Sequence, residues 1–312
     1  MSTSLAIGFA LLVLNTLVGM MANGFIVLFI CIDWFRSRKS SPTDLILGCI
    51  GLSRFLWHMI AIMTSIMAFF FKHTNIQNFP SIMISATWFF VNSVNLWFAA
   101  LLSVLYFVKV AIFSHPLFLQ MKQRYSGLVP WLLLASVVFS AALTIIIITT
   151  GTNAFSTCHS YQSLSSNRSS SEIQTLNFCK NFVILYYAPN IIPSMLFLSS
   201  SILLISSLGK HIRHLQNSGS GIKDLNMQIH LTAIKVLVSF TVLYLSSFIA
   251  VILLSVESLN SEVLWTAAIF ANVSAMYPSA HALILILVNP KLKEGCVRML
   301  HHFKCHLSEA SS

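Results

Sequence analysis

Charged residues are rare in this chain, and their positions divide it into long apolar stretches. It has 18 Lys and Arg residues and 8 Asp and Glu residues among 312. Seven stretches carry no charge or a single one, and each can supply the roughly 20 apolar residues that an α-helix needs to cross a bilayer. Because backbone amides in hydrocarbon must bond within their own segment, each stretch is expected to be helical. The stretches are residues 1–32, 45–71, 73–108, 125–167, 181–209, 236–256 and 263–290.

The expected architecture is therefore an all-α membrane protein with a seven-transmembrane helix bundle. A composition of 56 % hydrophobic and 8 % charged residues excludes a soluble domain, which is typically about half apolar and a quarter charged. The connections leave no room for a second domain, so we expect a single domain over residues 1–312. The helices are predicted at residues 5–32, 45–71, 81–108, 127–149, 181–209, 231–256 and 263–288, with a solvated outer loop at 151–180 and a cytoplasmic tail at 289–312.

The basic residues predict the orientation of the bundle. Fourteen Lys and Arg residues fall in segments that share one side, whereas only Lys72, Arg168 and Lys180 fall on the other. The positive-inside rule then puts the N-terminus outside and the C-terminus in the cytoplasm, as in a multi-pass protein of the plasma membrane. The basic surplus is expected to face anionic membrane lipid or a cytoplasmic partner rather than nucleic acid.

The spans offer no clear set of residues for catalysis or metal binding. No acidic residue lies in the core of a span, and neither an HExxH nor a Cys-x-x-Cys motif occurs. Only His58 and His281 lie within spans, and we expect them toward opposite ends of the membrane, too far apart to share a metal ion. The chain is therefore not expected to be an enzyme or to hold a metal or cofactor.

The expected outer loop contains two possible modification sites. Asn167, Arg168 and Ser169 form a glycosylation sequon on the predicted outer side. Cys158 and Cys179 share the same loop, and they either pair as a disulfide or stay as free thiols.

One charge lies inside a span and requires an explanation. Arg54 is in the second stretch, where burying it costs about 2.5 to 3.5 kcal/mol on insertion scales. It needs several acceptors from neighbouring helices, and we expect it inside the bundle, at a polar contact that joins those helices. Asn23 and Asn95 are interpreted as residues that join helices, at about 0.6 kcal/mol per contact.

A second group of polar and aromatic residues predicts a binding site. Trp88 and Asn92 are separated by four residues in the third span and share a helix face. A ring and an amide facing a cavity suit a small molecule, although a Trp near the membrane interface also serves as an anchor.

Blocks along the whole chain, in order, resemble one family. The block YPSAHALILILVNPKLK resembles the end of the seventh helix in bitter taste receptors, the type 2 taste receptors, and LSRFLW resembles their second-helix Leu-x-Ser-Arg signature. Further blocks agree: Asn23 to Ile26 with CIDWFRSRK in the first helix and loop, Tyr106 to Lys109 as the third-helix Tyr-Phe-x-Lys pattern, LLISSLGKH in the fifth helix, and HLTAIK with LYLSS in the sixth.

The resemblance implies a G-protein-coupled receptor for bitter small molecules, with a gustducin-type heterotrimeric G protein as its partner and calcium signalling downstream. It implies glycosylation at Asn167. It assigns structural or switch roles to Asn23, Arg54, Tyr106, Lys109 and His281. The ligand contacts that it implies are Trp88, Phe89 and Asn92 of the third helix, with Ser65, Phe182, Tyr186, Ser247, Val251 and Ala271 lining the same cavity.

The chain departs from the family pattern at three positions. Ala282 replaces a common Ser after the seventh-helix His, so Arg54 must find other acceptors, with Asn23 or backbone carbonyls as candidates. Ser247 replaces a common aromatic residue at the cavity floor. Ala271 replaces an acidic or polar group of some members, which predicts a preference for neutral, largely apolar bitter molecules.

The residues count against three other classes of protein. A vomeronasal type 1 pheromone receptor is the nearest alternative, but the Leu-x-Ser-Arg and Tyr-Pro-Ser-x-His blocks favour taste. A seven-helix membrane enzyme would need His and acidic residues at one depth, and a transporter would need a continuous polar path. The spans indicate neither arrangement.

Overall fold

The computed structural model describes residues 3–38, 41–70, 78–110, 116–162, 188–217, 223–257 and 264–310, which are almost entirely helical. Within these residues seven helices are long and apolar enough to cross a membrane, which confirms the expected seven-helix bundle. They are α1 (Thr3–Ser37), α2 (Pro42–Phe70), α3 (Asn78–Val110), α4 (Pro116–Gln162), α6 (Ile191–Asn217), α7 (Lys223–Glu257) and α8 (Leu264–Val288). A 3-10 turn, η1 (Ala188–Asn190), precedes α6, and α9 (Pro290–Ala310) follows α8.

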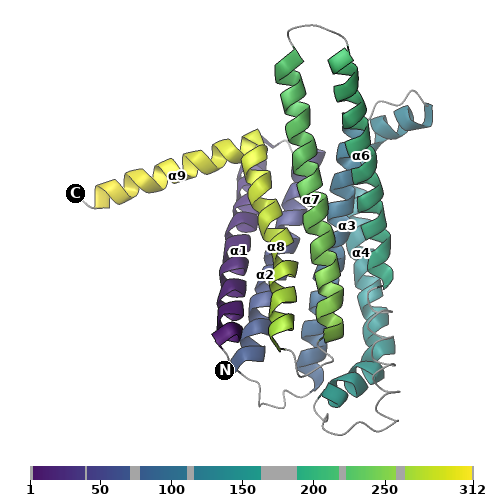
Figure 1. Ribbon diagram of the computed structural model, residues 1–312, viewed down its shortest axis with the longest axis vertical. Helices are drawn as coiled ribbons and strands as arrows, with labels where there is room; N and C mark the ends of the chain where they lie inside the picture. The colour runs from purple at the N-terminus through teal and green to yellow at the C-terminus, as the bar shows by residue number, and fades with distance from the viewer. Residues whose placement is uncertain are drawn as a thin grey trace.

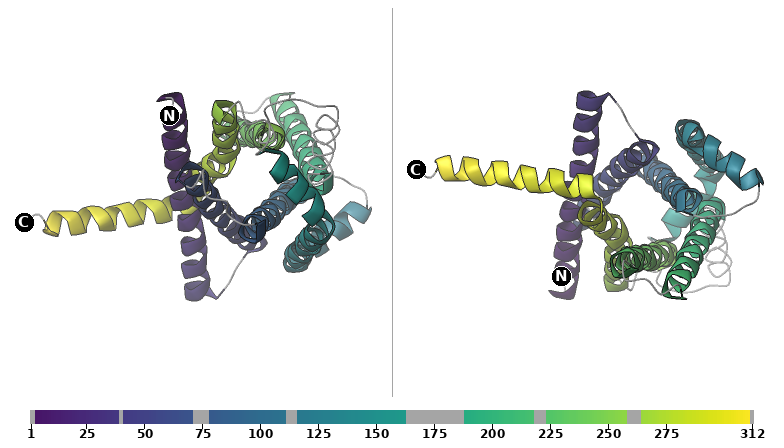
Figure 2. Two further views of the ribbon diagram at one scale, coloured as in Figure 1. Left: turned by 90° about the horizontal axis from the view of Figure 1, so that it is seen from below. Right: turned by 90° about the horizontal axis from the view of Figure 1, so that it is seen from above.

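The spanning helices run side by side and surround a common axis (Figures 1 and 2). Helix α1 packs against α2 and α8, α3 packs against α2, α4 and α6, and α7 packs against α6 and α8. The apolar stretch of α3 is 78 % buried, whereas those of α4 and α7 are 22 % buried. Helix α3 is therefore the central helix, and its polar side chains face protein rather than lipid.

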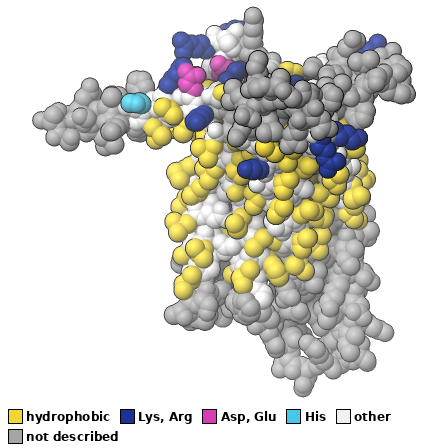
Figure 3. Space-filling view, turned by 45° about the horizontal axis from the view of Figure 1, so that its top comes forward, with side chains coloured by type: hydrophobic (Ala, Val, Ile, Leu, Met, Phe, Trp, Pro, Cys, Tyr) yellow, Lys and Arg dark blue, Asp and Glu magenta, His cyan; other side chains and the backbone are white. Residues whose placement is uncertain are grey.

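The outside of the bundle has the character of a lipid-facing surface. Large apolar side chains along α1 are more than half exposed: Ile7, Leu14, Met21, Leu28 and Ile32. Lys and Arg side chains gather at the end of the bundle from which α9 extends, above a belt of apolar side chains (Figure 3). We call this the basic end, and the opposite end, where α1 begins, the N-terminal end (Figure 1).

Helix α4 is longer than its apolar pattern predicts. It begins at Pro116 and continues to Gln162, so the first part of the expected outer loop is helical instead of irregular. Proline is favoured at the first position of a helix, which explains the start. No proline lies between Trp131 and Gln162, so no residue obliges the helix to end where the most apolar residues end.

Helix α9 was not expected, because residues 289–312 were interpreted only as a tail. Its start is capped by Asn289, whose Oδ1 accepts hydrogen bonds from the backbone N–H of Lys291 at 3.0 Å and of Leu292 at 3.5 Å. Asparagine before a helix followed by proline at its first position is a strong start signal. Leu292 is buried, which ties this start to the bundle while the rest of α9 extends sideways (Figure 1).

Candidate functional site

Arg54 lies fully buried in α2 and is held by two other helices. Its Nε donates to Asn95 Oδ1 of α3 at 3.2 Å, and its Nη1 lies 2.7 Å from His281 Nδ1 of α8. Because a guanidinium group only donates, Nδ1 of His281 must be the acceptor. The guanidinium carbon also lies 4.7 Å from the ring centroid of Tyr277, a cation–π contact. We call Arg54, Asn95, Tyr277 and His281 the polar centre.

The partners of Arg54 differ from the two that the sequence suggested. Asn23 donates from Nδ2 to the backbone oxygens of Gly19 at 2.8 Å and Pro278 at 3.2 Å, so it joins α1 to α8. The prediction that Asn23 or backbone carbonyls accept from Arg54 is wrong. The acceptors of Arg54 are instead Asn95, which the sequence suggested only as a contact between helices, and His281. Asn95 can accept because the central position of α3 turns its amide toward the buried charge.

The prediction that the two histidines of the spans lie toward opposite ends of the membrane is wrong. His58 Nε2 is 3.4 Å from Ser279 Oγ, and Ser279 precedes His281 by two residues in α8. Helices α1, α2 and α8 meet closely here, because Gly19 leaves room for the imidazole of His58 and the hydroxyl of Ser279. Within the described part of the chain no group of three His, Cys, Asp or Glu side chains is placed to hold a metal ion.

A small cavity lies beside the polar centre. Its volume is about 20 Å³, which is enough for a water molecule and far too small for an organic ligand. Residues from α2, α3, η1, α7 and α8 line it: Trp57, Asn92, Asn95, Leu96, Asn190, Tyr244, Ser247, Phe248, Val251, Ser274, Tyr277 and Pro278.

Three of the expected ligand contacts, Asn92, Ser247 and Val251, line this cavity. The position of Ser247 follows from a proline in the facing helix. Pro278 has no N–H, so the carbonyl of Ser274, four residues earlier in α8, lacks its helical donor. The Ser247 hydroxyl donates to that carbonyl at 2.9 Å and thereby joins α7 to α8.

Four other expected contacts lie toward the N-terminal end, beyond this cavity. Trp88 is half-buried one helical turn from Asn92, and Phe89 is completely buried. The Ser65 hydroxyl donates to Ala61 O of its own helix at 2.6 Å. Ala271 is half-buried one turn before Ser274. Phe182 and Tyr186 lie outside the described residues.

Sequence reasoning missed several residues of the cavity wall. Asn190 is the clearest, because it is a polar residue within the fifth apolar stretch and the criterion applied to Asn23 would have selected it. Tyr244 stacks on Phe197 with ring centroids 4.1 Å apart, and its hydroxyl lies 2.9 Å from Ser194 Oγ of α6. Aromatic residues in an apolar stretch give no sign of which way they face, so no pattern identified Tyr244.

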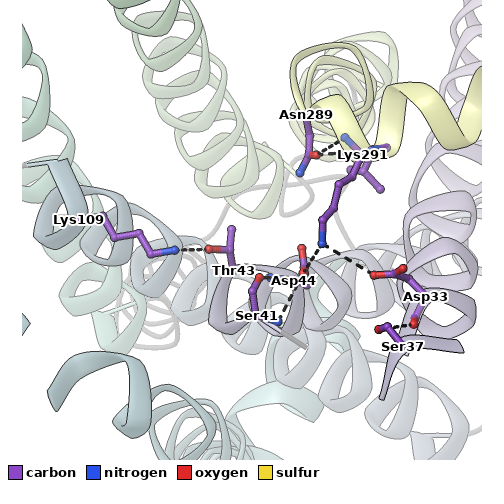
Figure 4. Close-up of polar contacts among 9 residues, drawn as sticks. Asp33, Ser37, Ser41, Thr43, Asp44, Lys109, Asn289 and Lys291 are labelled. Carbon is purple, nitrogen blue, oxygen red and sulfur yellow. Dashed lines mark hydrogen bonds and ion pairs between the residues drawn. The ribbon is translucent and has the colours of Figure 1, made fainter. Parts of the chain in front are cut away.

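Polar contacts also join the helices at the basic end (Figure 4). Lys109 Nζ donates to Thr43 Oγ1 at 2.6 Å and so joins α3 to α2. Lys291 of α9 lies 3.3 Å from Asp44 of α2 and 3.8 Å from Asp33 of α1. Tyr106, one turn before Lys109, packs against the apolar core.

The side chains of the predicted modification sites are not among those that the structure describes. Asn167 and Cys179 lie outside the described residues, and Cys158 is in α4 but its side chain is not described.

Comparison with known proteins identifies the family. A family model for the taste receptor protein family (TAS2R) matches residues 1–304. The chain belongs to the type 2 taste receptors. It is similar to taste receptor type 2 member 41 of Mus musculus, 34 % identical over 288 residues, covering 92 % of each chain. It is also similar to member 1 of Pan paniscus, 34 % identical over 309 residues (98 % of this chain and 99 % of the relative), and to member 40 of Gallus gallus, 34 % identical over 294 residues (93 % of each).

The family expected from the sequence is therefore confirmed, in preference to the vomeronasal alternative. The receptor is a multi-pass membrane protein of the G-protein-coupled class, and its relatives are receptors rather than enzymes.

Proposed function

We propose that this receptor detects bitter small molecules at the plasma membrane, couples to a gustducin-type heterotrimeric G protein and raises cytosolic calcium. The observation that carries the proposal is the family match over residues 1–304, together with a cavity among the helices that three of the expected ligand contacts line. Residues 1–312 act as one receptor domain, without a metal or cofactor.

The ligand contacts are proposed as one continuous surface that leads from the cavity toward the N-terminal end. Asn92, Ser247 and Val251 form its inner part. Its outer part comprises Trp88, Phe89, Ser65, Ala271, Phe182 and Tyr186. Trp88 and Ala271 each lie one turn, about 5 Å, farther toward the N-terminal end than a residue of the cavity wall.

A bitter compound that reaches the inner part of this surface must widen the cavity, whose volume is about 20 Å³. A ligand that fits the widened state better than the closed one shifts the population toward it. A tenfold preference corresponds to about 1.4 kcal/mol.

The receptor should prefer neutral, largely apolar molecules. Among the described residues the cavity wall has no acidic side chain, and the fully buried Arg54 contacts two of its members, Asn95 and Tyr277. A cationic ligand would lose its hydration without gaining a counter-charge. Activation by permanently charged amines at potencies equal to those of neutral terpenoids or aromatics would contradict this preference.

The basic end is proposed as the cytoplasmic face that contacts the G protein, with the N-terminus and Asn167 outside and Asn167 glycosylated. The gathering of Lys and Arg at this end supports the orientation. Helix α9 would lie along the inner leaflet: its Val297, Met299 and Leu300 are exposed apolar side chains, suited to contact lipid.

The test is calcium release in cells that co-express the receptor and a promiscuous Gα subunit, against a panel of bitter compounds. Trp88→Ala and Asn92→Ala should each lower potency at equal surface expression. Trp131→Ala is the matched control, because Trp131 is 69 % exposed on the outside of α4. Undiminished activation in both cavity variants would remove the proposed site. Replacing the promiscuous subunit with a gustducin chimera tests the partner separately.

A further inference from the structure

Arg54 is a buried cation without an acidic partner in the part of the chain that the structure describes. The groups that contact it are an amide, an imidazole and a phenol ring, and its Nη2 has no hydrogen-bond partner among the described residues. The candidate spans contain two acidic residues, Asp33 and Asp44, and both pair with Lys291 at the basic end. Asp44 precedes Arg54 by ten residues in α2, about 15 Å along the helix. No side chain of the spans can therefore neutralise this charge by contact.

The adjacent cavity is lined by polar groups that lack partners. Asn190 is 1 % exposed, and both its Nδ2 and Oδ1 are without a hydrogen bond. The hydroxyl of Tyr277, 3 % exposed, has no acceptor for its hydrogen. Asn95 gives its Oδ1 to Arg54, so its NH₂ group is the end left for another partner. Buried polar groups are rarely left unsatisfied, so a cavity with several of them indicates an occupant.

We propose that this cavity is a binding site for a small monovalent inorganic anion of the size of chloride, which serves as the counter-charge of Arg54. Arg54 does not itself line the cavity, but Asn95 and Tyr277, which contact its guanidinium group, do. The anion would accept hydrogen bonds from the NH₂ group of Asn95, the hydroxyl of Tyr277 and the NH₂ group of Asn190. Because neither amide atom of Asn190 is bonded, turning that NH₂ group toward the anion breaks no hydrogen bond.

The size and the charge of the site distinguish an anion from other occupants. A cavity of about 20 Å³ suits a monatomic ion better than a larger organic anion. A cation would be repelled by Arg54, and none of the described residues that line the cavity has a carboxylate to hold one. A water molecule would satisfy the same donors but would leave the charge of Arg54 uncompensated in a low-dielectric interior.

The consequence is that chloride should stabilise the folded receptor without any agonist, because a ligand that binds the native state alone stabilises it by mass action. The inference therefore does not depend on the proposed bitter ligands. The test uses the full-length receptor in lipid nanodiscs and compares its melting temperature in sodium chloride, sodium bromide and sodium gluconate at equal ionic strength.

The wild-type receptor should melt at a higher temperature in chloride and bromide than in gluconate, with a saturable dependence on chloride. Tyr277→Phe keeps the ring over Arg54 and removes one donor, and Asn190→Ala removes another. Each should lower the apparent chloride affinity by about tenfold or more, the expected effect of losing a hydrogen bond to a charged group. Tyr125→Phe is the control, because it removes a buried hydroxyl that donates to Leu101 O, away from the cavity.

A second variant tests the charge rather than the donors. Asn95→Asp supplies a fixed carboxylate beside Arg54, so its melting temperature should no longer depend on chloride. Equal melting of the wild type in all three salts would mean that water fills the cavity and would overturn the proposal. A chloride dependence that survives unchanged in Tyr277→Phe, Asn190→Ala and Asn95→Asp would place the anion elsewhere and would overturn it as well.

Discussion

Gly19 is the position where one added methyl group should do most harm to the polar centre. A Cβ at Gly19 would overlap the imidazole of His58 and the hydroxyl of Ser279. Neither neighbour has room to withdraw: His58 is completely buried with its ring against Trp57, and the Ser279 hydroxyl is bonded to Asn15 O at 3.0 Å. Gly19→Ala should therefore separate α1 from α2 and α8 and disturb His58, one turn from Arg54.

The magnitude follows from a comparison within the same helix. Overpacking costs about 1 to 3 kcal/mol. Alanine also improves the helix itself by about 1 kcal/mol, which partly hides that cost. Gly24→Ala is the matched control, because a Cβ there would lie 3.6 Å from the Phe55 ring, an ordinary contact. The gain in helix propensity cancels between the two variants, so their stability should differ by the packing cost alone, about 1 to 3 kcal/mol.

Thermal unfolding of the purified receptor, followed with a thiol-reactive dye, measures this difference. Gly19→Ala should melt at least about 2 °C below Gly24→Ala, taking about 2 to 4 °C per kcal/mol for a chain of this scale. Surface expression in cells should fall in the same order. Equal melting temperatures for the two variants would refute the claim that α1, α2 and α8 meet closely at Gly19.

Three further predictions concern the other polar contacts. Ser247→Ala leaves the Ser274 carbonyl without a donor and should destabilise the receptor by about 1 to 3 kcal/mol in thermal unfolding, whereas Ser246→Ala, which loses a bond only within its own helix, should melt close to the wild type. Asn95→Leu removes an acceptor from the buried charge and should cost about 3 to 5 kcal/mol, seen as loss of surface expression; normal expression would show that Arg54 does not need Asn95. Lys291→Gln breaks exposed ion pairs and should change stability by about 1 kcal/mol or less; a larger shift in melting temperature would mean that these pairs hold the basic end together.

The positions of the spans could be predicted because, in a membrane, whether a segment forms a helix depends on that segment alone. Each apolar stretch must satisfy its backbone hydrogen bonds within itself, so length and charge are enough to place it. The same reasoning identified Arg54 as a charge in need of acceptors. It did not place the ends of α4 or the start of α9, since those ends are set by proline and capping residues and not by hydropathy.

The partners inside the bundle could not be predicted in the same way. Asn23 and Asn95 are both amides at membrane depth, and only the rotation of α1 and α3 about their axes decides that Asn95 meets Arg54 while Asn23 meets Pro278. His58 and His281 are far apart in sequence. The relative depth of α2 and α8 places His281 in the polar centre and His58 beside Ser279, two residues before His281.

Apolar stretches, a basic surplus on one side and a single interior arginine are properties of the chain that hold for any packing of its helices, because they depend only on each segment and its solvent. The identity of the residues around that arginine, and the cavity beside it, depend on how seven helices turn and slide against one another. Side-chain packing between helices sets those angles and depths, and no single segment contains that information.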